Sequence, residues 1–448
     1  MHASTQPLKQ SVRQQIETLD SERRGQEMLS LARDLYPICR SLTGPGNRET
    51  LARIQRDVPL DVHEVASGTP VFDWTVPPEW TLREAWIKNA QGQKVVDFAD
   101  HNLHVVGYSQ PVHTTLSREA LEPHLHSIPE SPDWIPYRTS YYQETWGFCL
   151  AHKIKAALPG GEYEVYIDAE LKPGHLTYGE LVLPGQRDET VLFSTHICHP
   201  SLANDNLSGI AVATQLIQLL AEVDRVYTYR FLFIPGTIGS ITWLALHPEE
   251  TKQIRHGLVL SCVGDAGQPH YKRSRAGDAL IDRAVAQVFR QDAADAVVQD
   301  FSPYGYDERQ YGSPGVNLPV GLFTRSPHGT FPEYHTSADN LDLLSGEALT
   351  DSLRLLLESV AIVEGNASYR NLYPMGEPQL GRRGLYASLG GANDRADNQL
   401  AMLWILNQSD GAHSLLDIAE RSGYSFARIR HMADVLVEHA LLEEVGAP

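Results

Sequence analysis

The sequence predicts an α/β fold with a doubly wound sheet, a β-rich inserted domain and a small helical C-terminal domain. From about residue 163, short apolar runs typical of strands alternate with segments of helical period. Such alternation indicates a mainly parallel sheet that is covered on both faces. Residues 58–159 differ, because short β-like runs rich in Pro, Trp and His replace the helical period.

The predicted elements follow a definite order along the chain. A helix is expected over 26–40, and the Gly- and Pro-containing segment 41–46 ends it. The predicted strands cover 163–167, 177–183, 191–195, 229–234, 258–263 and 318–323. The helices expected in the same part cover about 210–220, 240–247, 278–290 and 346–364. After a linker at 371–396, three helices are expected at 399–406, 415–419 and 426–442, and the last two resemble a helix-turn-helix.

These changes of pattern set the predicted domain boundaries. The α/β domain is expected to comprise 1–57 and 160–370, the β-rich insert 58–159, and the C-terminal domain 385–448. A chain of 448 residues is long enough for two or three domains.

The composition indicates which partners and which cellular compartment to expect. The net charge of −19 disfavours nucleic acid and anionic membranes as partners, and no apolar run is long enough to span a membrane. The four cysteines are widely separated and form no C-x-x-C pair, which favours a reducing compartment. A cytoplasmic location is therefore expected, and a homo-oligomer is compatible with the sequence.

One stretch, 194–209, carries the strongest chemical signal. His196 ends an apolar strand-like run, and Asp205 lies in the loop that leads into the next helix. In parallel sheets, ligands gather beyond the carboxyl ends of the strands. A neutral imidazole and a carboxylate suit zinc, and His335 would bring a second imidazole from a distant segment. An isolated histidine at a strand end can also be merely hydrogen-bonded, but the motifs together favour a metal site.

The order His196, Asp205, Asp265, His335 resembles that of the co-catalytic zinc aminopeptidases. The stretch 204–209 is similar to their bridging-aspartate motif, and 334–339 is similar to their last ligand motif. The chain resembles still more closely a bacterial family of polysaccharide-biosynthesis proteins with an aminopeptidase-like domain. That resemblance is carried by the segments 39–44, 72–74, 135–142, 195–200 and 307–311. It implies a zinc-aminopeptidase-like doubly wound mixed sheet and a C-terminal winged-helix-like domain.

The resemblance also implies roles for individual residues. Asp205 would bridge two metals, His196 and His335 would hold one ion, and Asp265 would help to hold the other. Tyr334 would donate a hydrogen bond to the tetrahedral oxyanion. The implied reaction is metal-assisted hydrolysis of an amide in a small peptide or aminoacyl substrate. From the residues alone, Asp265 could instead shape a turn and Tyr334 could be ordinary core.

Two departures from the aminopeptidase pattern are visible. The adjacent glutamates of that family are absent from 233–240, where Gly236 stands, and Cys198 replaces an aspartate that would orient His196. One zinc ion is therefore expected rather than two. Glu308 is the predicted substitute for the missing general base, although a charged cluster such as 306–310 is often a solvated loop.

Other polar side chains are predicted to support the site. His199 and Asp307 are expected next to the metal ligands and the base, and His199 is itself a second candidate for the base. Arg309 and Arg325 could pair with a substrate carboxylate, because arginine suits bidentate recognition.

Two functions remain open beside hydrolysis. One is a non-catalytic metal- or ligand-binding scaffold in a biosynthetic pathway, in which Gly236 marks lost catalysis. The other is a transcription regulator that uses the C-terminal unit, where Arg428 and Arg430 lie on a predicted second helix. The acidic neighbours Asp434 and Glu438 weaken that reading.

Overall fold

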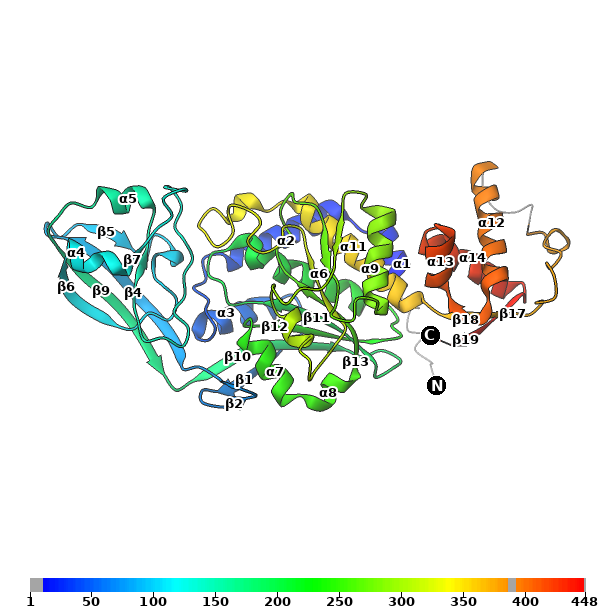
Figure 1. Cartoon of the computed structure of the whole chain (residues 1–448), viewed down its shortest axis with the longest axis horizontal. Helices are drawn as coiled ribbons and strands as arrows, with labels where there is room; N and C mark the ends of the chain where they lie inside the picture. The colour runs from blue at the N-terminus through cyan, green and yellow to red at the C-terminus, as the bar shows by residue number, and fades with distance from the viewer. Residues whose placement is uncertain (1–10, 386–391, 447–448) are drawn as a thin grey trace, which may run out of the picture. The chain divides into compact units, whose positions relative to one another are not determined.

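The computed structural model describes residues 11–385 and 392–446, which fold as two compact units (Figure 1). The first unit runs over Met1–Ala279 and Asp295–Arg354, and the second over Leu280–Ala294 and Leu355–Pro448. No helix among the described residues is long and apolar enough to cross a membrane.

An eight-stranded mixed sheet organises the first unit. The strand order is β1-β10-β12-β11-β13-β16-β14-β15. The strands are β1 (Asp61–Ala66), β10 (His175–Leu183), β11 (Thr190–His196), β12 (Thr228–Ile234), β13 (Ile254–Leu260), β14 (His270–Lys272), β15 (Val297–Gln299) and β16 (Val320–Thr324). The strand β11 pairs in parallel with both β12 and β13, whereas β10 joins β12 antiparallel. The predicted doubly wound mixed sheet is confirmed.

Helices cover this sheet from two sides (Figure 1). Among the helices of this unit, α2 and α6 are drawn on one side of the sheet and α7 and α8 on the other. The helices are α1 (Val12–Glu17), α2 (Ser21–Leu35), α3 (Pro45–Ile54), α6 (Gly209–Ala221), α7 (Ile238–Leu246), α8 (Pro248–Gln253), α10 (Glu308–Tyr311) and the start of α11 (Gly346–Gly365). Every residue of β11 is buried, as expected for a central strand covered on both faces. Its end at His196 therefore lies in the middle of the sheet's carboxyl edge.

The β-rich part is built on a four-stranded antiparallel sheet in the order β5-β4-β9-β6. Its strands are β4 (Glu79–Asn89), β5 (Lys94–Asp97), β6 (Val112–Ser117) and β9 (Glu162–Lys172), with the short elements β2 (Pro70–Val71), β3 (Trp74–Thr75), β7 (Leu125–His126), β8 (Phe148–Cys149), α4 (Arg118–Leu121) and α5 (His152–Ala157) beside them. The strand predicted at 163–167 belongs to β9 in this sheet rather than to the main one. Its alternating buried and half-buried residues fit an antiparallel sheet with one covered face.

The second unit contains a winged-helix domain. A three-stranded sheet, β18-β17-β19, accompanies three helices. The elements are α9 (Leu280–Asp292), the remainder of α11, β17 (Ser368–Asn371), α12 (Ala392–Gln408), β18 (Asp410–Ser414), α13 (Leu415–Ser422), α14 (Phe426–Glu438) and β19 (Leu442–Gly446). Gly423, at φ 77°, ends α13 and allows the tight turn into α14. The predicted linker 371–396 falls partly outside the described residues.

Candidate metal centre

The candidate centre lies at the carboxyl end of β11, where the sheet gives way to the start of α6. His196 is the last residue of β11 and is paired with Ile234 of β12. The following chain turns through Ala203–Ser208, in which Asp205 and Asn206 leave helical geometry. The His196 Nε2 atom lies 2.8 Å from Asp205 Oδ1, and both side chains are fully buried.

His335 approaches the same carboxylate from the other side. Its Nε2 atom lies 3.0 Å from Asp205 Oδ2. Among the described residues, neither of these two buried atoms has a hydrogen-bond partner of acceptable geometry. A buried carboxylate oxygen and an imidazole nitrogen that make no well-aligned hydrogen bond are costly unless a further group binds them. A cation that both atoms ligate would meet this requirement.

His199 completes a group of three ligand atoms. One atom each from His196, His199 and Asp205 lie within 4.8 Å of one another. Zinc bonds of about 2.0–2.2 Å in tetrahedral geometry place neighbouring ligands roughly 3.3 Å apart. Small side-chain movements would therefore close this group around an ion. The prediction placed His199 in a supporting role, but its position is that of a possible ligand.

The protonation states of these groups suit a metal. Burial lowers the pKa of His196 and lowers that of His199 well below its usual range, which favours the neutral imidazole that binds metals. Burial alone would raise the pKa of Asp205, but the imidazoles of His199, His196 and His335 together hold it well below its usual range. The centre thus combines an ionised carboxylate with neutral imidazoles.

Neighbouring side chains hold the backbone of the centre in place. The carboxylate oxygens of Asp339 accept hydrogen bonds from the backbone N–H groups of Asn204 and Asp205, at 2.6 and 3.0 Å. The guanidinium of Arg40, which is 1 % exposed, donates to the carbonyl oxygen of His199 at 2.9 Å. These bonds fix the residues that present the ligands.

Asp265, a predicted ligand, is buried but engaged in the loop. Its Oδ2 atom accepts from Asn204 Nδ2 at 2.9 Å, and its Oδ1 atom accepts from Gly267 N at 2.9 Å. The Asn204 side chain also accepts from Gly264 N, so this network ties the two loops together. Asp265 thus holds the turn at 265–267 in this structure, and its role as a metal ligand stays a prediction.

A tyrosine fills the space at position 236, where the aminopeptidase glutamates are missing. A Cβ atom at Gly236 would overlap the Cε1 and Cζ atoms of Tyr306. The Tyr306 ring packs on His196 with centroids 3.9 Å apart, and its hydroxyl lies 3.4 Å from Cys198 Sγ. Sequence reasoning missed Tyr306, because nothing local to 306 indicates contact with position 236.

The predicted base Glu308 is engaged away from the ligand group. Its Oε1 atom lies 2.6 Å from Lys272 Nζ, and both of its carboxylate oxygens accept from the backbone N–H of Tyr306. The carboxylate of Glu308 is thus paired with a buried lysine and holds the Tyr306 loop, and its role as the general base stays a prediction. Arg309, predicted to bind substrate, is exposed on α10.

Asp307, the neighbour of Glu308, has a different partner. Its carboxyl group accepts a hydrogen bond from Ser240 Oγ at 3.0 Å, on the first turn of α7. Burial raises the pKa of Asp307 to about 8. Asp307 therefore anchors the loop that carries Tyr306 to the helix that follows Gly236.

Two further tyrosines border the centre. The Tyr334 ring stacks on His335 with centroids 4.0 Å apart, and the Tyr137 ring meets His335 edge-on at 5.1 Å. Tyr137 comes from the β-rich part, where its backbone N–H donates to the carbonyl oxygen of His335 at 2.8 Å. The β-rich part thus supplies one wall of the centre.

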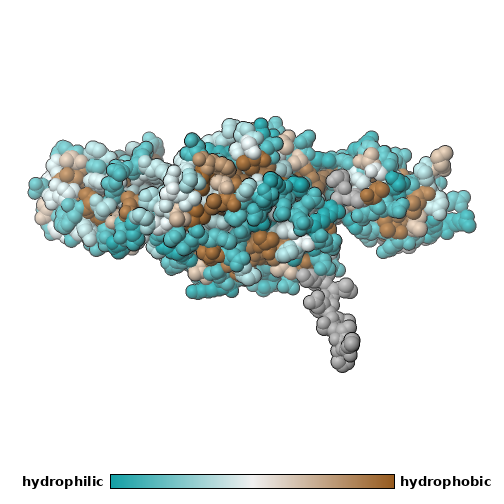
Figure 2. Space-filling view, turned by 90° about the horizontal axis from the view of Figure 1, so that it is seen from below, coloured by the Kyte–Doolittle hydropathy of each residue, from teal (hydrophilic) through white to brown (hydrophobic). Residues whose placement is uncertain are grey.

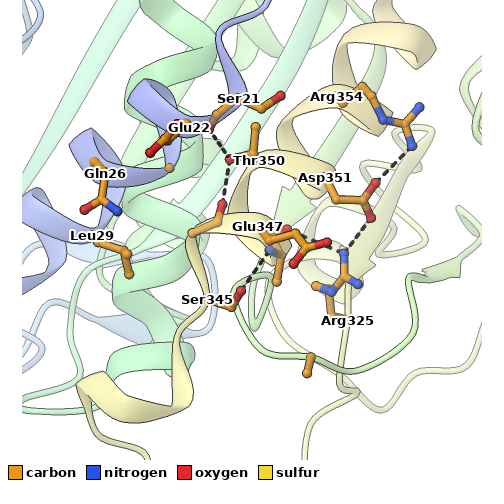
Figure 3. Close-up of a pocket in the computed structure, with 14 residues that line it drawn as sticks. Ser21, Glu22, Gln26, Leu29, Arg325, Ser345, Glu347, Thr350, Asp351 and Arg354 are labelled. Atoms are coloured by element: carbon orange, nitrogen blue, oxygen red, sulfur yellow. Dashed lines mark hydrogen bonds and ion pairs between the residues drawn. The ribbon is translucent and has the colours of Figure 1, made fainter.

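Arg325 lies in a different cavity, of about 710 Å³, lined by none of the histidines named above (Figure 3). Its Nη1 atom lies 2.8 Å from Asp351 Oδ2, and Arg354 binds the other oxygen of the same carboxylate at 2.9 Å. The guanidinium is therefore paired within the protein, and its pairing with a substrate carboxylate stays a prediction.

A larger hollow of about 890 Å³ lies between the β2–β3 hairpin, the α7–α8 region and the loop 313–319. Phe72 and Leu244 are among the residues that line it. In Figure 2, which views the molecule from the side of α7 and α8, apolar side chains gather in the central part. None of the histidines of the candidate centre lines this hollow. Association between copies of the chain remains a prediction.

Comparisons with known proteins agree with this fold. Residues 29–366 match the model of a domain of unknown function, DUF4910, and residues 367–444 match a winged helix-turn-helix model. A protein of Clostridium acetobutylicum named as a polysaccharide biosynthesis protein with an aminopeptidase-like domain is 50 % identical over 426 residues, covering 95 % of this chain and 98 % of that protein.

Solved structures show the same relationship. A crystal structure of a C. acetobutylicum protein described as a peptidase superimposes with a TM-score of 0.92 at 48 % identity, covering 97 % of this chain and 99 % of that one. A zinc aminopeptidase from Bacillus subtilis superimposes with a TM-score of 0.56 at 14 % identity, covering 76 % and 94 % of the two chains. At that identity the second likeness is one of fold.

Proposed function

The chain belongs to the DUF4910 family and is 50 % identical to a protein named for an aminopeptidase-like domain, and on that premise we propose that it is a zinc-dependent hydrolase of amide bonds. The proposed substrate is a small peptide or an aminoacyl compound. The name of the C. acetobutylicum relative supports a place in polysaccharide biosynthesis.

One observation carries this proposal. Asp205 Oδ2 and His335 Nε2 face each other, buried, 3.0 Å apart and without an acceptable hydrogen bond between them. His196 and His199 add imidazoles on the same carboxylate. Zinc accepts this donor set, and when bound it polarises a carbonyl oxygen and lowers the pKa of a water molecule.

The tyrosines would supply the polar contacts to the substrate. Burial raises the pKa of Tyr306 and of Tyr334, so both phenols stay protonated at neutral pH and can donate hydrogen bonds. A neutral donor beside developing negative charge stabilises a transition state. Tyr334, which stacks on His335, retains its proposed role as a donor to the oxyanion.

Purified full-length protein tests this proposal. Protein prepared without chelator or a nickel column is assayed for zinc and for hydrolysis of a panel of aminoacyl amides. We expect bound zinc, chelator-sensitive hydrolysis, and loss of both in His196→Ala and His335→Ala. Zinc-loaded protein that hydrolyses no member of the panel would sink the enzymatic proposal.

A non-catalytic scaffold is the second candidate, and a specific observation favours it. The ring of Tyr306 occupies the space at Gly236, and Glu308 is paired with Lys272, so neither position offers a free carboxylate. General bases commonly contribute about 10²–10⁴-fold to rate. A small amide that raises the melting temperature of the zinc-loaded protein without being cleaved would support this candidate.

We propose no nucleic-acid partner for the winged helix. Arg428 Nη1 donates to Asn398 Oδ1 at 2.7 Å, and Arg430 pairs with Asp434 at 3.0 Å and donates to the carbonyl oxygen of Gly365. These arginines are engaged within the second unit rather than displayed for phosphates. Binding to duplex DNA that weakens steeply with salt would overturn this view.

A further inference from the structure

We propose that Asp205, Cys262 and His328 form a second zinc position, which shares Asp205 with the first. One ligand atom from each of the three lies within 4.8 Å of the others, and all three side chains are buried. The inference deepens the proposed function, because the shared carboxylate would then bridge two ions. Cys262 and His328 had no role in the sequence-based prediction.

The backbone of Cys262 is held in an unusual conformation. Cys262 follows β13 at φ 52°, in the left-handed region that residues with a side chain rarely adopt. Its N–H donates to Asn206 Oδ1 at 3.3 Å, and its carbonyl oxygen accepts from Arg325 N at 2.8 Å. His335 shares this conformation, at φ 56°. Such conformations cluster at functional sites, where surrounding contacts enforce them.

The hydroxyl of Ser261, the residue before Cys262, orients the His328 ring. Ser261 Oγ lies 2.8 Å from His328 Nε2, with both side chains buried. A hydrogen bond of this kind fixes the orientation of a ligating imidazole. The His328 ring also stacks on that of Tyr306, at a centroid distance of 5.6 Å. Because Tyr306 also packs on His196, the second zinc position adjoins the first.

The donor set selects the ion. A thiolate, an imidazole and a carboxylate favour zinc over the hard cations Mg²⁺ and Ca²⁺. On binding, the Cys262 thiol would release its proton to solvent and bind as a thiolate. Three protein ligands leave the fourth position of a tetrahedral ion open.

The experiment uses full-length protein under reducing conditions. Metal is removed with chelator, Co²⁺ is added stepwise, and bound ions are counted by native mass spectrometry while the near-ultraviolet spectrum is recorded. We expect two equivalents of Co²⁺ and a thiolate-to-cobalt charge-transfer band. Cys262→Ser should lose one equivalent and the band, and His328→Gln should lose one equivalent. Cys149→Ser, which removes a buried thiol from β8, should change neither.

The outcomes separate this inference from the proposed function. One equivalent of Co²⁺ without a thiolate band in folded wild-type protein overturns the second position, whatever the activity. Two equivalents and an unchanged band in Cys262→Ser overturn it as well. Two equivalents, with the band lost in Cys262→Ser, support the second position even if no amide is hydrolysed. Circular dichroism verifies that each variant is folded. If Cys262→Ser is not folded, the ion count of His328→Gln and the wild-type spectrum decide whether the second position exists.

Discussion

The ring of Tyr306 occupies the space into which a side chain at position 236 would project. A larger residue at 236 and the Tyr306 ring in this position therefore exclude each other. Gly236 is compatible with this arrangement only because it has no Cβ. The loop that carries Tyr306 is fixed in turn by Glu308, which accepts from the Tyr306 N–H, and by Asp307, which accepts from Ser240. Contacts from its own loop thus hold Tyr306 in place beside the candidate metal centre.

Gly236→Ala should destabilise the protein. Overpacking of a buried site usually costs about 1–3 kcal/mol, and here the new methyl group meets the Tyr306 ring. In the double variant Gly236→Ala/Tyr306→Ala the loss should be smaller than the sum of the two single losses. Urea unfolding of the four proteins measures this coupling. Strictly additive losses would show that the two residues do not compete for space.

Glu308→Gln should be strongly destabilising. Removal of one partner of a buried ion pair leaves the other charge uncompensated, at a cost of about 3–5 kcal/mol. The affected partner is Lys272, which is 6 % exposed. The double variant Lys272→Met/Glu308→Gln should recover part of this loss, as measured by chemical denaturation. Full hydrolytic activity in a folded Glu308→Gln protein would also exclude Glu308 as the base.

Asp307 makes stability depend on pH in a defined direction. Because burial raises its pKa in the folded state to about 8, the unfolded chain loses this proton at lower pH than the folded protein. The contribution of Asp307 to stability therefore falls as pH rises from about 4 towards 8. Asp307→Asn should remove this fall and be more stable than wild type at pH 7.

Unfolding free energies measured between pH 5 and 8 test this prediction. The exposed Asp188→Asn serves as control. An Asp307→Asn protein that follows the same pH profile as wild type would contradict the assignment.

Arg40→Lys should weaken zinc binding while leaving the fold intact. The Arg40 guanidinium spans the carbonyl oxygens of His199 and Leu35, and a lysine ammonium cannot bridge both in the same geometry. Loss of a group that positions a ligand typically costs about 10–100-fold in metal affinity. Competition with a chromogenic chelator measures the affinity. Arg53→Lys, which alters an arginine paired with Asp34 instead of with the backbone of the centre, should leave it unchanged.

Local patterns were sufficient to predict the main architecture. The buried apolar run that ends at His196 marks a central strand, and parallel sheets place such ends at one edge. His196, Asp205 and His335 are indeed brought together there. The strand β9 was placed in the wrong sheet, since periodicity reports how a strand is buried but does not identify its neighbours.

The remainder of the centre depends on tertiary packing. Glu308 carries a carboxylate, as a general base requires. Its surroundings differ from those expected of a base, because Lys272 of β14 forms an ion pair with it. Cys262 has no motif around it, and only its left-handed backbone and the approach of His328 indicate a ligand. In the sequence, the one signal was its position: Cys262 lies just beyond the carboxyl end of β13, as His196 lies at the end of β11.

The zinc content of wild type and Asp205→Asn, measured in parallel on chelator-free full-length protein, tests the central claim most directly. Asp205 is the carboxylate that faces His196 and His335, and asparagine preserves its size while removing its charge. We predict at least one zinc ion per wild-type chain and none in Asp205→Asn. A zinc-free wild type after loading, or equal zinc in both proteins, would contradict the assignment of this cluster as a metal centre.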